Sequence, residues 1–160
     1  MNSEEPIGYM ERTRLYYRAL GYRNDYVWAQ FPDVPFARLG KPLGTARIGL
    51  VTTAGPPGGY VRDAAGQRHV WSGETTAQPV RLATEMSWDR ESTHTDDVGT
   101  FLPIEVLKQL AADGAIGGLT AHFHGVPTEY SQHKTLDQDA PQVLSRLRDD
   151  GADAAILCPL

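Results

Sequence analysis

One short run of apolar, β-branched residues constrains the fold of this chain more than any other feature. It covers residues 47–53 (Arg-Ile-Gly-Leu-Val-Thr-Thr) and ends in the Gly- and Pro-rich stretch 54–59. A nearly continuous apolar run bounded by turn residues is typical of a strand buried on both faces, as in a parallel sheet. The run therefore predicts a buried strand of such a sheet.

Two helices are expected after this strand. Residues 103–112 combine a proline in the first turn with a glycine just past the end, at Gly114. Residues 139–151 begin with Asp139 and Gln142 at the spacing of a capping box and end at Gly151. Both segments carry apolar residues at helical spacing.

Strands are expected between and after these helices, over residues 119–123 and, as a buried strand, over 154–157. Weaker patterns predict strands at 69–71 and 79–82. Strand, helix, strand, helix and strand in this order indicate the α/β class with right-handed crossovers. We predict a Rossmann-like three-layer sheet, mainly parallel.

The first 45 residues have a different character. Residues 7–20 place Tyr, Met and Leu side chains among arginines and stop at Gly21, which predicts an amphipathic helix with a glycine cap. A Pro- and aromatic-rich stretch follows, in which the prolines favour extended backbone. We expect an N-terminal helix and wrapping arm in residues 1–45, and a single compact α/β domain in residues 46–160.

Composition excludes several partners and locations. The 160 residues include 15 Lys and Arg against 20 Asp and Glu, so the net charge of −5 gives no basic surface for DNA or RNA. No apolar run approaches the roughly 20 residues that span a bilayer, and the N-terminus is acidic where a signal peptide is basic. We therefore expect a cytoplasmic protein without a membrane partner. The single cysteine, Cys158, excludes an internal disulfide.

Chemistry-bearing side chains are expected near the carboxyl ends of the strands, where ligands collect in open α/β sheets. His94 and Asp97 precede the first of the two helices, and His122 and His124 lie at the end of a predicted strand. Together they could hold a divalent metal or form an acid/base pair, if the fold brings the two segments together. Each also fits a structural role: the histidines as surface or hydrogen-bonded residues, and Asp97 as a turn residue before a helix.

Two further features give weaker signals. The loop 55–59 follows a strand, as a phosphate loop does, but it lacks the GxGxxG spacing and a Walker-type lysine, so no cofactor-binding residue is predicted. Cys158, at a strand end, fits either a reactive thiol or a small buried hydrophobe.

A set of short motifs occurs in one order along the chain. The motifs are Tyr16–Tyr22, Tyr26–Ala29, Pro35-Phe36, Lys41–Leu43, Ile48–Ala54, Asp97 followed by Phe101–Ile104, Gly114–Gly117, and Asp150–Ala154. In this order they resemble the glycine, sarcosine and betaine reductase selenoprotein B family, which also includes D-proline reductase-like members. The resemblance covers most of the chain from about Tyr16 onward.

The resemblance implies a redox subunit whose reactive selenocysteine or cysteine lies just beyond the last strand, in a U/C-x-x-C pattern. Aligned in this way, the redox residue directly follows Leu160. Because the selenocysteine codon UGA also reads as a stop, we expect this sequence to be a truncated reading of a longer selenoprotein. Cys158 lies before the redox position and does not take its role.

Site residues carry over only in part from the resemblance. Family members have a histidine upstream of the segment that here reads Met86–Arg90, and this chain has none there. By position, Asp97 and the region of His122 correspond best to the family's site.

Three functions stay open from the sequence. The first is a selenoprotein B-like oxidoreductase subunit that cleaves a C–N bond of a small amino-acid-type substrate reductively, beside a partner reductase subunit or in a homo-oligomer. The resemblance implies that the substrate amine adds to a carbonyl group on the partner before a selenolate attacks the α-carbon. The candidate catalytic residues are Asp97, His94, His122 and His124. The second is a metal-dependent hydrolase or lyase that uses the same four residues, and the third is a non-catalytic scaffold or binding subunit.

Overall fold

The computed structural model describes residues 8–25, 27, 29–35, 37–77, 82–84, 91, 94–129 and 131–160. The chain divides into two compact units, Met1–Phe36 and Ala37–Leu160. The boundary predicted between residues 45 and 46 lies within the second unit, near its start. Most of the weakly predicted strand 79–82, and all of residues 86–90, lie outside the described residues.

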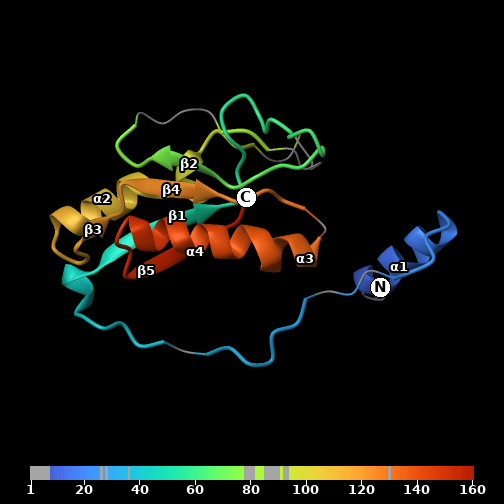
Figure 1. The fold of residues 1–160 in the computed structure, drawn as a ribbon, viewed down its shortest axis with the longest axis horizontal. Helices are drawn as coiled ribbons and strands as arrows, with labels where there is room; N and C mark the ends of the chain where they lie inside the picture. Colours follow the sequence, from blue (N-terminus) through green and yellow to red (C-terminus); the bar gives the residue numbers. More distant parts are fainter. Residues whose placement is uncertain are drawn as a thin grey trace, which may run out of the picture. The chain divides into compact units, whose positions relative to one another are not determined.

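A five-stranded sheet forms the centre of the second unit (Figure 1). Its strands are β1 (Arg47–Thr52), β2 (Trp71–Glu74), β3 (Gly118–Leu119), β4 (His122–Gly125) and β5 (Ala154–Cys158). β1 pairs in parallel with β3, β4 and β5, while β2 pairs antiparallel with β4. The prediction of an α/β protein with a mainly parallel sheet is confirmed.

The register places β1 in the middle of the sheet. Val51 pairs with His124 of β4 and with Leu157 of β5, so these two strands lie on opposite sides of β1. All residues of β1 after Arg47 are buried, as the apolar run predicted. Because β1, β4 and β5 are parallel, their carboxyl ends meet at one edge of the sheet.

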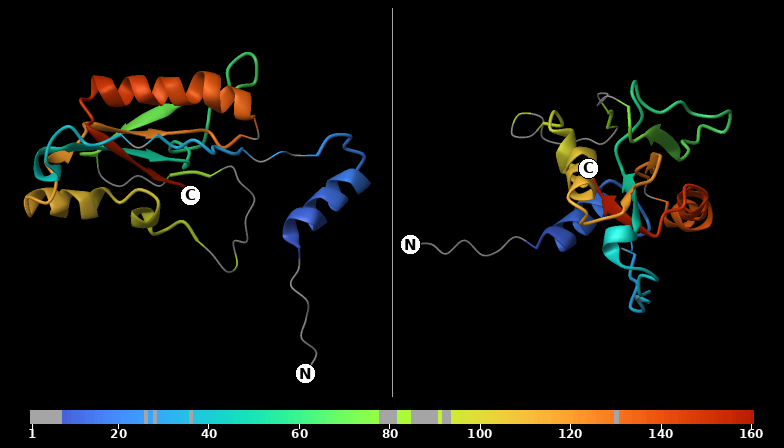
Figure 2. Two further views of the ribbon diagram at one scale, coloured as in Figure 1. Left: turned by 90° about the horizontal axis from the view of Figure 1, so that it is seen from below. Right: turned by 90° about the vertical axis from the view of Figure 1, so that its left-hand side faces the viewer.

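Helices cover both faces of the sheet. Figure 2 shows α2 (Ile104–Ala112) on one face and α4 (Ala140–Asp149) on the other. On the α2 side, Leu107 belongs to a core cluster with Leu50 and Phe123. On the α4 side, a second cluster is formed by Val51, Val70, Val143 and Leu147. The side chains of neighbouring residues in β1 thus point to opposite faces of the sheet, as the pleat of a strand requires.

Both predicted helix ends occur where glycine permits them. α2 is followed by Gly114 with φ of +72°, and α4 by Gly151 with φ of +71°. Residues with side chains adopt this conformation rarely, so the glycines end the helices as expected. The helix prediction over 103–112 is confirmed within one residue.

The predicted start of the last helix is wrong. Asp139 is itself helical and makes no capping hydrogen bond. The helical segment begins earlier, with α3 (Gln132–Lys134), where the Ser131 side chain accepts a hydrogen bond from the Lys134 backbone, and continues through the π-helix η3 (Thr135–Asp139) into α4. Asp139 is buried instead of capping because its carboxylate faces Lys134, a contact that the local pattern does not contain.

The prediction of a buried last strand is also wrong. β5 pairs only with β1 among the described strands, and its three central residues are exposed, Leu157 by 72%. Its apolar sequence resembles that of a central strand, but it occupies an edge. β2 begins at Trp71, two residues later than the weak pattern at 69–71 predicted.

The first unit contains one described helix, α1 (Tyr9–Ala19), close to the predicted bounds of 7–20. Gly21 follows with φ of +87°, and the backbone N–H of Tyr22 donates to the Tyr17 carbonyl. Arg18 pairs with Asp25 at 2.8 Å from Nε to Oδ1. The helix has no buried residue. That the arm wraps over the core stays a prediction.

Two short 3-10 turns complete the described elements, η1 (Leu43–Thr45) and η2 (Val98–Thr100). Within the part of the chain that the structure describes, the longest apolar helix falls short of what a membrane span requires.

Candidate functional site

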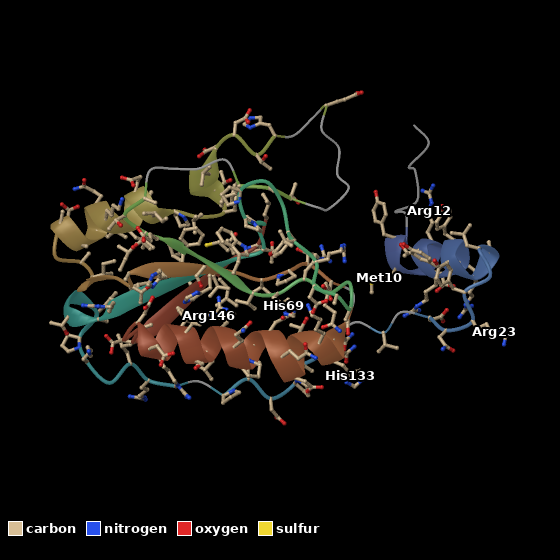
Figure 3. All side chains as sticks on the ribbon, turned by 45° about the horizontal axis from the view of Figure 1, so that its top comes forward. Met10, Arg12, Arg23, His69, His133 and Arg146 are labelled. Carbon is tan, nitrogen blue, oxygen red and sulfur yellow. The ribbon has the colours of Figure 1, made fainter. Side chains whose placement is uncertain are left out.

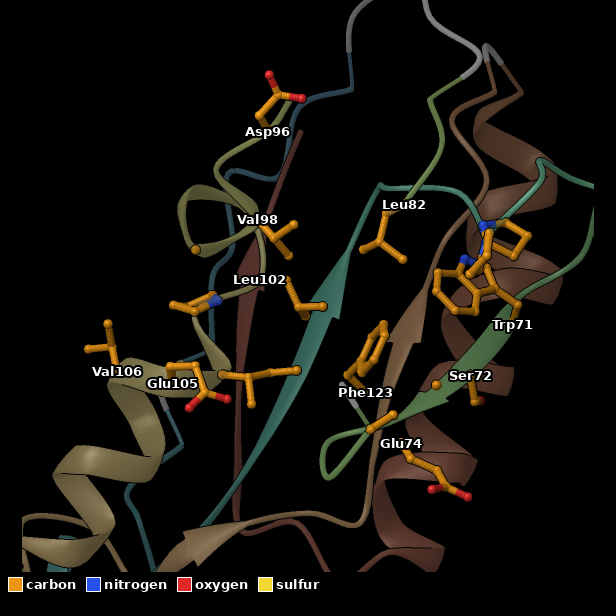
Figure 4. Close-up of a pocket in the computed structure, with 17 residues that line it drawn as sticks. Trp71, Ser72, Glu74, Leu82, Asp96, Val98, Leu102, Glu105, Val106 and Phe123 are labelled. Atoms are coloured by element: carbon orange, nitrogen blue, oxygen red, sulfur yellow. The ribbon is translucent and has the colours of Figure 1, made fainter. Parts of the chain in front are cut away.

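A large pocket of about 710 Å³ opens in the second unit between the sheet and the segment that contains η2 and α2 (Figure 4). Trp71 and Phe123 line it from β2 and β4, and Leu102 and Val106 line it from the helical side. A volume of this size is typical of small-molecule sites. The sequence did not point to this pocket.

An aromatic pair shapes the sheet side of the pocket. Trp71 and Phe123 pack edge to face, with ring centroids 5.3 Å apart and an interplanar angle of 84°. The Trp71 indole N–H donates to the Ala54 carbonyl at 3.1 Å, which fixes the ring. A Cβ on Gly73 would lie 2.5 Å from the Phe123 ring, and a Cβ on Gly125 would collide with the Trp71 indole. The two glycines therefore make room for the aromatic rings.

The charged residues that line this pocket are all acidic. They are Glu74, Asp96 and Glu105, and no Lys, Arg or His is among the described lining residues. Lys108 pairs with Glu105 at 2.8 Å and offsets part of its charge. An apolar pocket with aromatic rings in its lining and only acidic residues among its charged ones is suited to a small ligand that carries an ammonium group.

His122 and His124 face away from this pocket. They are two residues apart on β4, so they lie on one face of the sheet and Phe123 lies on the other. With Ser72, Arg146 and Asp150 they line a smaller pocket of about 180 Å³ on the side of α4.

Both histidines of the smaller pocket are held through their Nδ1 atoms. His122 Nδ1 lies 3.0 Å from Asp150 Oδ2, and His124 Nδ1 lies 2.9 Å from Ser72 Oγ. Arg146 donates to the same hydroxyl at 2.8 Å. The His124 ring is 2% exposed, and its Nε2 has no hydrogen-bond partner among the described residues. Arg146 is among the side chains labelled in Figure 3.

His94 and Asp97 lie at a different place. The Asp97 carboxylate accepts a hydrogen bond from the Gly99 backbone at 3.0 Å and caps η2, which matches the structural role proposed for it. His94 is exposed, with its Nδ1 3.9 Å from Asp96. The two residues flank Asp96, which lines the large pocket.

The fold thus does not bring the four predicted residues together. His122 and His124 line the smaller pocket, while His94 and Asp97 adjoin the larger one. Within the described ranges, no three His, Cys, Asp or Glu residues are grouped so that they could hold a metal ion. The shared metal site expected from the sequence is not assembled from these residues, because β4 turns its two histidines to the α4 face.

Burial makes the ring of His124 harder to protonate. It lowers the pKa of His124 below its ordinary value, and the positive charge of Arg146 lowers it further. In the unfolded chain the ring takes up a proton near pH 6.5. The folded state takes up that proton only at lower pH, so stability falls as the pH drops through this range.

We therefore expect the free energy of unfolding to be lower at pH 5.5 than at pH 7.5, as measured by urea denaturation. The variant His124→Asn keeps an acceptor for the Ser72 hydroxyl but does not titrate, so its stability should depend less on pH over this range. An equal pH dependence in the variant and the wild type would contradict the assignment to His124.

A buried ionic cluster lies beside the smaller pocket's strand, where β4 leads into α3. Lys134 Nζ lies 2.6 Å from the Arg68 carbonyl, 3.1 Å from Glu129 Oε1 and 3.7 Å from Asp139 Oδ2. Burial raises the pKa of Asp139, although the charge of Lys134 opposes this. No sequence pattern indicates this cluster, because its members are spread from Arg68 to Asp139 and form no motif.

The chain that follows β5 packs on the face of the sheet on which the large pocket lies. The Leu160 side chain packs against the core cluster that includes Leu82, Leu102 and Phe123. These three residues also line the large pocket. Cys158, in β5, is a free and half-buried cysteine.

Comparison with known proteins gives one informative similarity. Over 146 residues the chain is 25% identical to the glycine reductase complex component B subunit gamma of Peptoclostridium acidaminophilum. The two chains are distantly related. The match covers 85% of this chain and 33% of the component B subunit gamma, so this chain spans about a third of the length of that relative. No protein-family model matches the chain, and no solved structure matches it.

Proposed function

We propose that this chain is part of a component of a glycine reductase-type complex, and that it acts as a selenoprotein B-like subunit. The observation that carries the proposal is the similarity to component B subunit gamma over 85% of the chain. In this proposal the domain is Rossmann-like, and a second subunit of the complex is its partner.

The proposed reaction is the reductive cleavage of a C–N bond in a small amino-acid-type substrate. A bond from the substrate α-carbon to selenium or sulfur forms as the C–N bond breaks, and the nitrogen leaves with the bonding electron pair and takes up a proton. A thiol reductant then forms a bond to the selenium or sulfur, and the α-carbon leaves with the electron pair and takes up a proton. The reacting selenocysteine or cysteine is the residue that directly follows Leu160. A selenolate suits this step because it is ionised at neutral pH and is a strong nucleophile.

The large pocket supports the proposal as the place for the substrate. Its lining is mainly apolar, and its charged lining residues, Glu74, Asp96 and Glu105, are all acidic. Such a site suits the positively charged nitrogen of an amine. Leu160 packs against the core cluster on the α2 side of the sheet, the face on which the pocket lies, and this supports a redox residue on that side.

Variants at the border of the pocket test this placement. Val106 lines the pocket and is 59% exposed, so Val106→Trp fills space at the border with little effect on the core. In the complex purified from the native host, we expect kcat/KM for C–N bond cleavage of glycine, sarcosine, betaine or D-proline to fall about tenfold or more.

The matched control is Val61→Trp, because Val61 is 88% exposed and does not line the pocket. It should leave kcat/KM within about twofold of the wild type. If Val106→Trp and Val61→Trp have the same activity, the substrate does not occupy this pocket. If the wild-type complex cleaves the C–N bond of none of these compounds, the proposed reaction is wrong.

A further inference from the structure

Thr53 holds the backbone of Leu160 at the carboxyl edge of the sheet. Thr53 directly follows β1, and the Leu160 N–H donates to its Oγ1 at 2.8 Å. The same hydroxyl donates to the Leu160 carbonyl oxygen at 3.4 Å. One side chain, 107 residues away in the sequence, therefore engages both polar groups of the Leu160 backbone.

These contacts begin where the strand pairing stops. The last registered pair between β1 and β5 is Thr52 with Cys158. Pro159 comes next and has no N–H to donate. Within the described part of the chain, both hydrogen bonds of the Leu160 backbone go to Thr53. The hydroxyl thus extends the attachment of the chain by two residues beyond the ladder.

The Leu160 side chain is held as well. It packs against the core cluster on the α2 side of the sheet, which includes Leu102 and Phe123 from the lining of the large pocket. Backbone and side chain are therefore fixed by different groups. Together they set the place and the direction in which the chain leaves the sheet.

We propose that Thr53 is a positioning residue for the redox centre. It holds the residue joined to the Leu160 carbonyl at the carboxyl edge of the sheet, next to a side chain that packs on the α2 face. This inference rests on the proposed function, in which that residue carries the reacting selenium or sulfur. A displacement at carbon requires the attacking atom to be held close to the α-carbon and in line with the leaving nitrogen, so a loosely held residue reacts more slowly.

The chemistry of threonine fits this role. Its branched Cβ restricts rotation of the side chain, and its hydroxyl both donates and accepts. Valine has nearly the same shape without the hydroxyl, and serine keeps the hydroxyl without the methyl group. Thr53→Val and Thr53→Ser therefore separate the hydrogen bonds from the packing.

The first test is hydrogen exchange of the Leu160 amide in the 160-residue protein, followed by NMR. We expect a protected amide in the wild type, exchange about fivefold faster in Thr53→Val, and exchange within about twofold of the wild type in Thr53→Ser. Thermal unfolding midpoints of the three proteins show whether each is folded. Equal exchange in the wild type and Thr53→Val overturns the inference.

The second test uses the protein purified from the native host with its redox residue. Thr53→Val should lower kcat for C–N cleavage about tenfold while KM stays within about twofold, and Thr53→Ser should restore kcat. An unchanged kcat in Thr53→Val overturns the inference and leaves the proposed function standing. A native protein without a selenocysteine or cysteine after Leu160 overturns the proposed function, and this inference with it.

Discussion

Replacement of Phe123 by alanine is expected to destabilise the second unit by about 3–5 kcal/mol, the usual range for a buried aromatic ring. Phe123 is 6% exposed, belongs to the core cluster on the α2 side and packs against Trp71. Its removal leaves a cavity that Gly73, which has no side chain, does not fill. Urea denaturation with fluorescence detection measures the change in the free energy of unfolding.

Phe123→Leu is the matched control for this prediction. Leucine keeps much of the buried volume but not the edge-to-face contact with Trp71, so its cost should be well below that of alanine. Because Phe123 also lines the large pocket, the alanine variant should lose activity along with stability. A loss of stability below about 1 kcal/mol in Phe123→Ala would contradict the central place of this ring in the core.

Replacement of Lys134 by methionine should have an effect of similar size, about 3–5 kcal/mol, because it leaves a buried carboxylate without its cation. Lys134 is 8% exposed and its ammonium group contacts Glu129, Asp139 and the Arg68 carbonyl. Glu129 keeps Arg68 as a partner at 3.3 Å. Asp139 is 3% exposed, so most of the loss should come from this carboxylate.

The double variant Lys134→Met with Asp139→Leu separates charge from packing. It removes both the buried cation and the carboxylate that needs it, so it should regain most of the stability lost in Lys134→Met. Burial raises the pKa of Asp139, so protonation of this carboxyl at low pH should also reduce the cost of Lys134→Met. Urea denaturation at pH 7.5 and pH 5 measures both effects. A double variant as unstable as the single one would contradict this account of the cluster.

Local patterns in the sequence predicted the elements that depend on local causes. The apolar run at β1 and the glycines after α2 and α4 each act on neighbouring residues, so strand, helices and helix ends were found close to their observed places. The parallel arrangement followed from the alternation of strand and helix.

The missed features depend on contacts between distant residues. β2 pairs with β4 about 50 residues away, and this pairing makes the sheet side of the large pocket, yet Trp71–Glu74 shows no clear alternation. Asp139 fits the sequence pattern of a helix N-cap, but it lies in a π-helical turn and its carboxylate pairs with the ammonium group of Lys134. An apolar sequence at β5 did not reveal that the strand lies at an edge.

The candidate site could be predicted only in part for the same reason. The sequence placed His122 and His124 on a strand, but it could not show which face of the sheet their side chains would occupy. The packing of α2 and α4 decides which face of the sheet carries the two histidines. It therefore also separates them from His94 and Asp97. The residues that line the large pocket carry no motif, so only the fold reveals them.

We propose that this chain is part of a selenoprotein B-like reductase subunit whose redox residue directly follows Leu160. The intact mass of the protein purified from its native host, grown with selenium, tests it most directly. The account predicts a mass well above 17.6 kDa with the isotope pattern of selenium. A mass that matches these 160 residues alone would contradict it, because the proposed reaction would then have no redox centre.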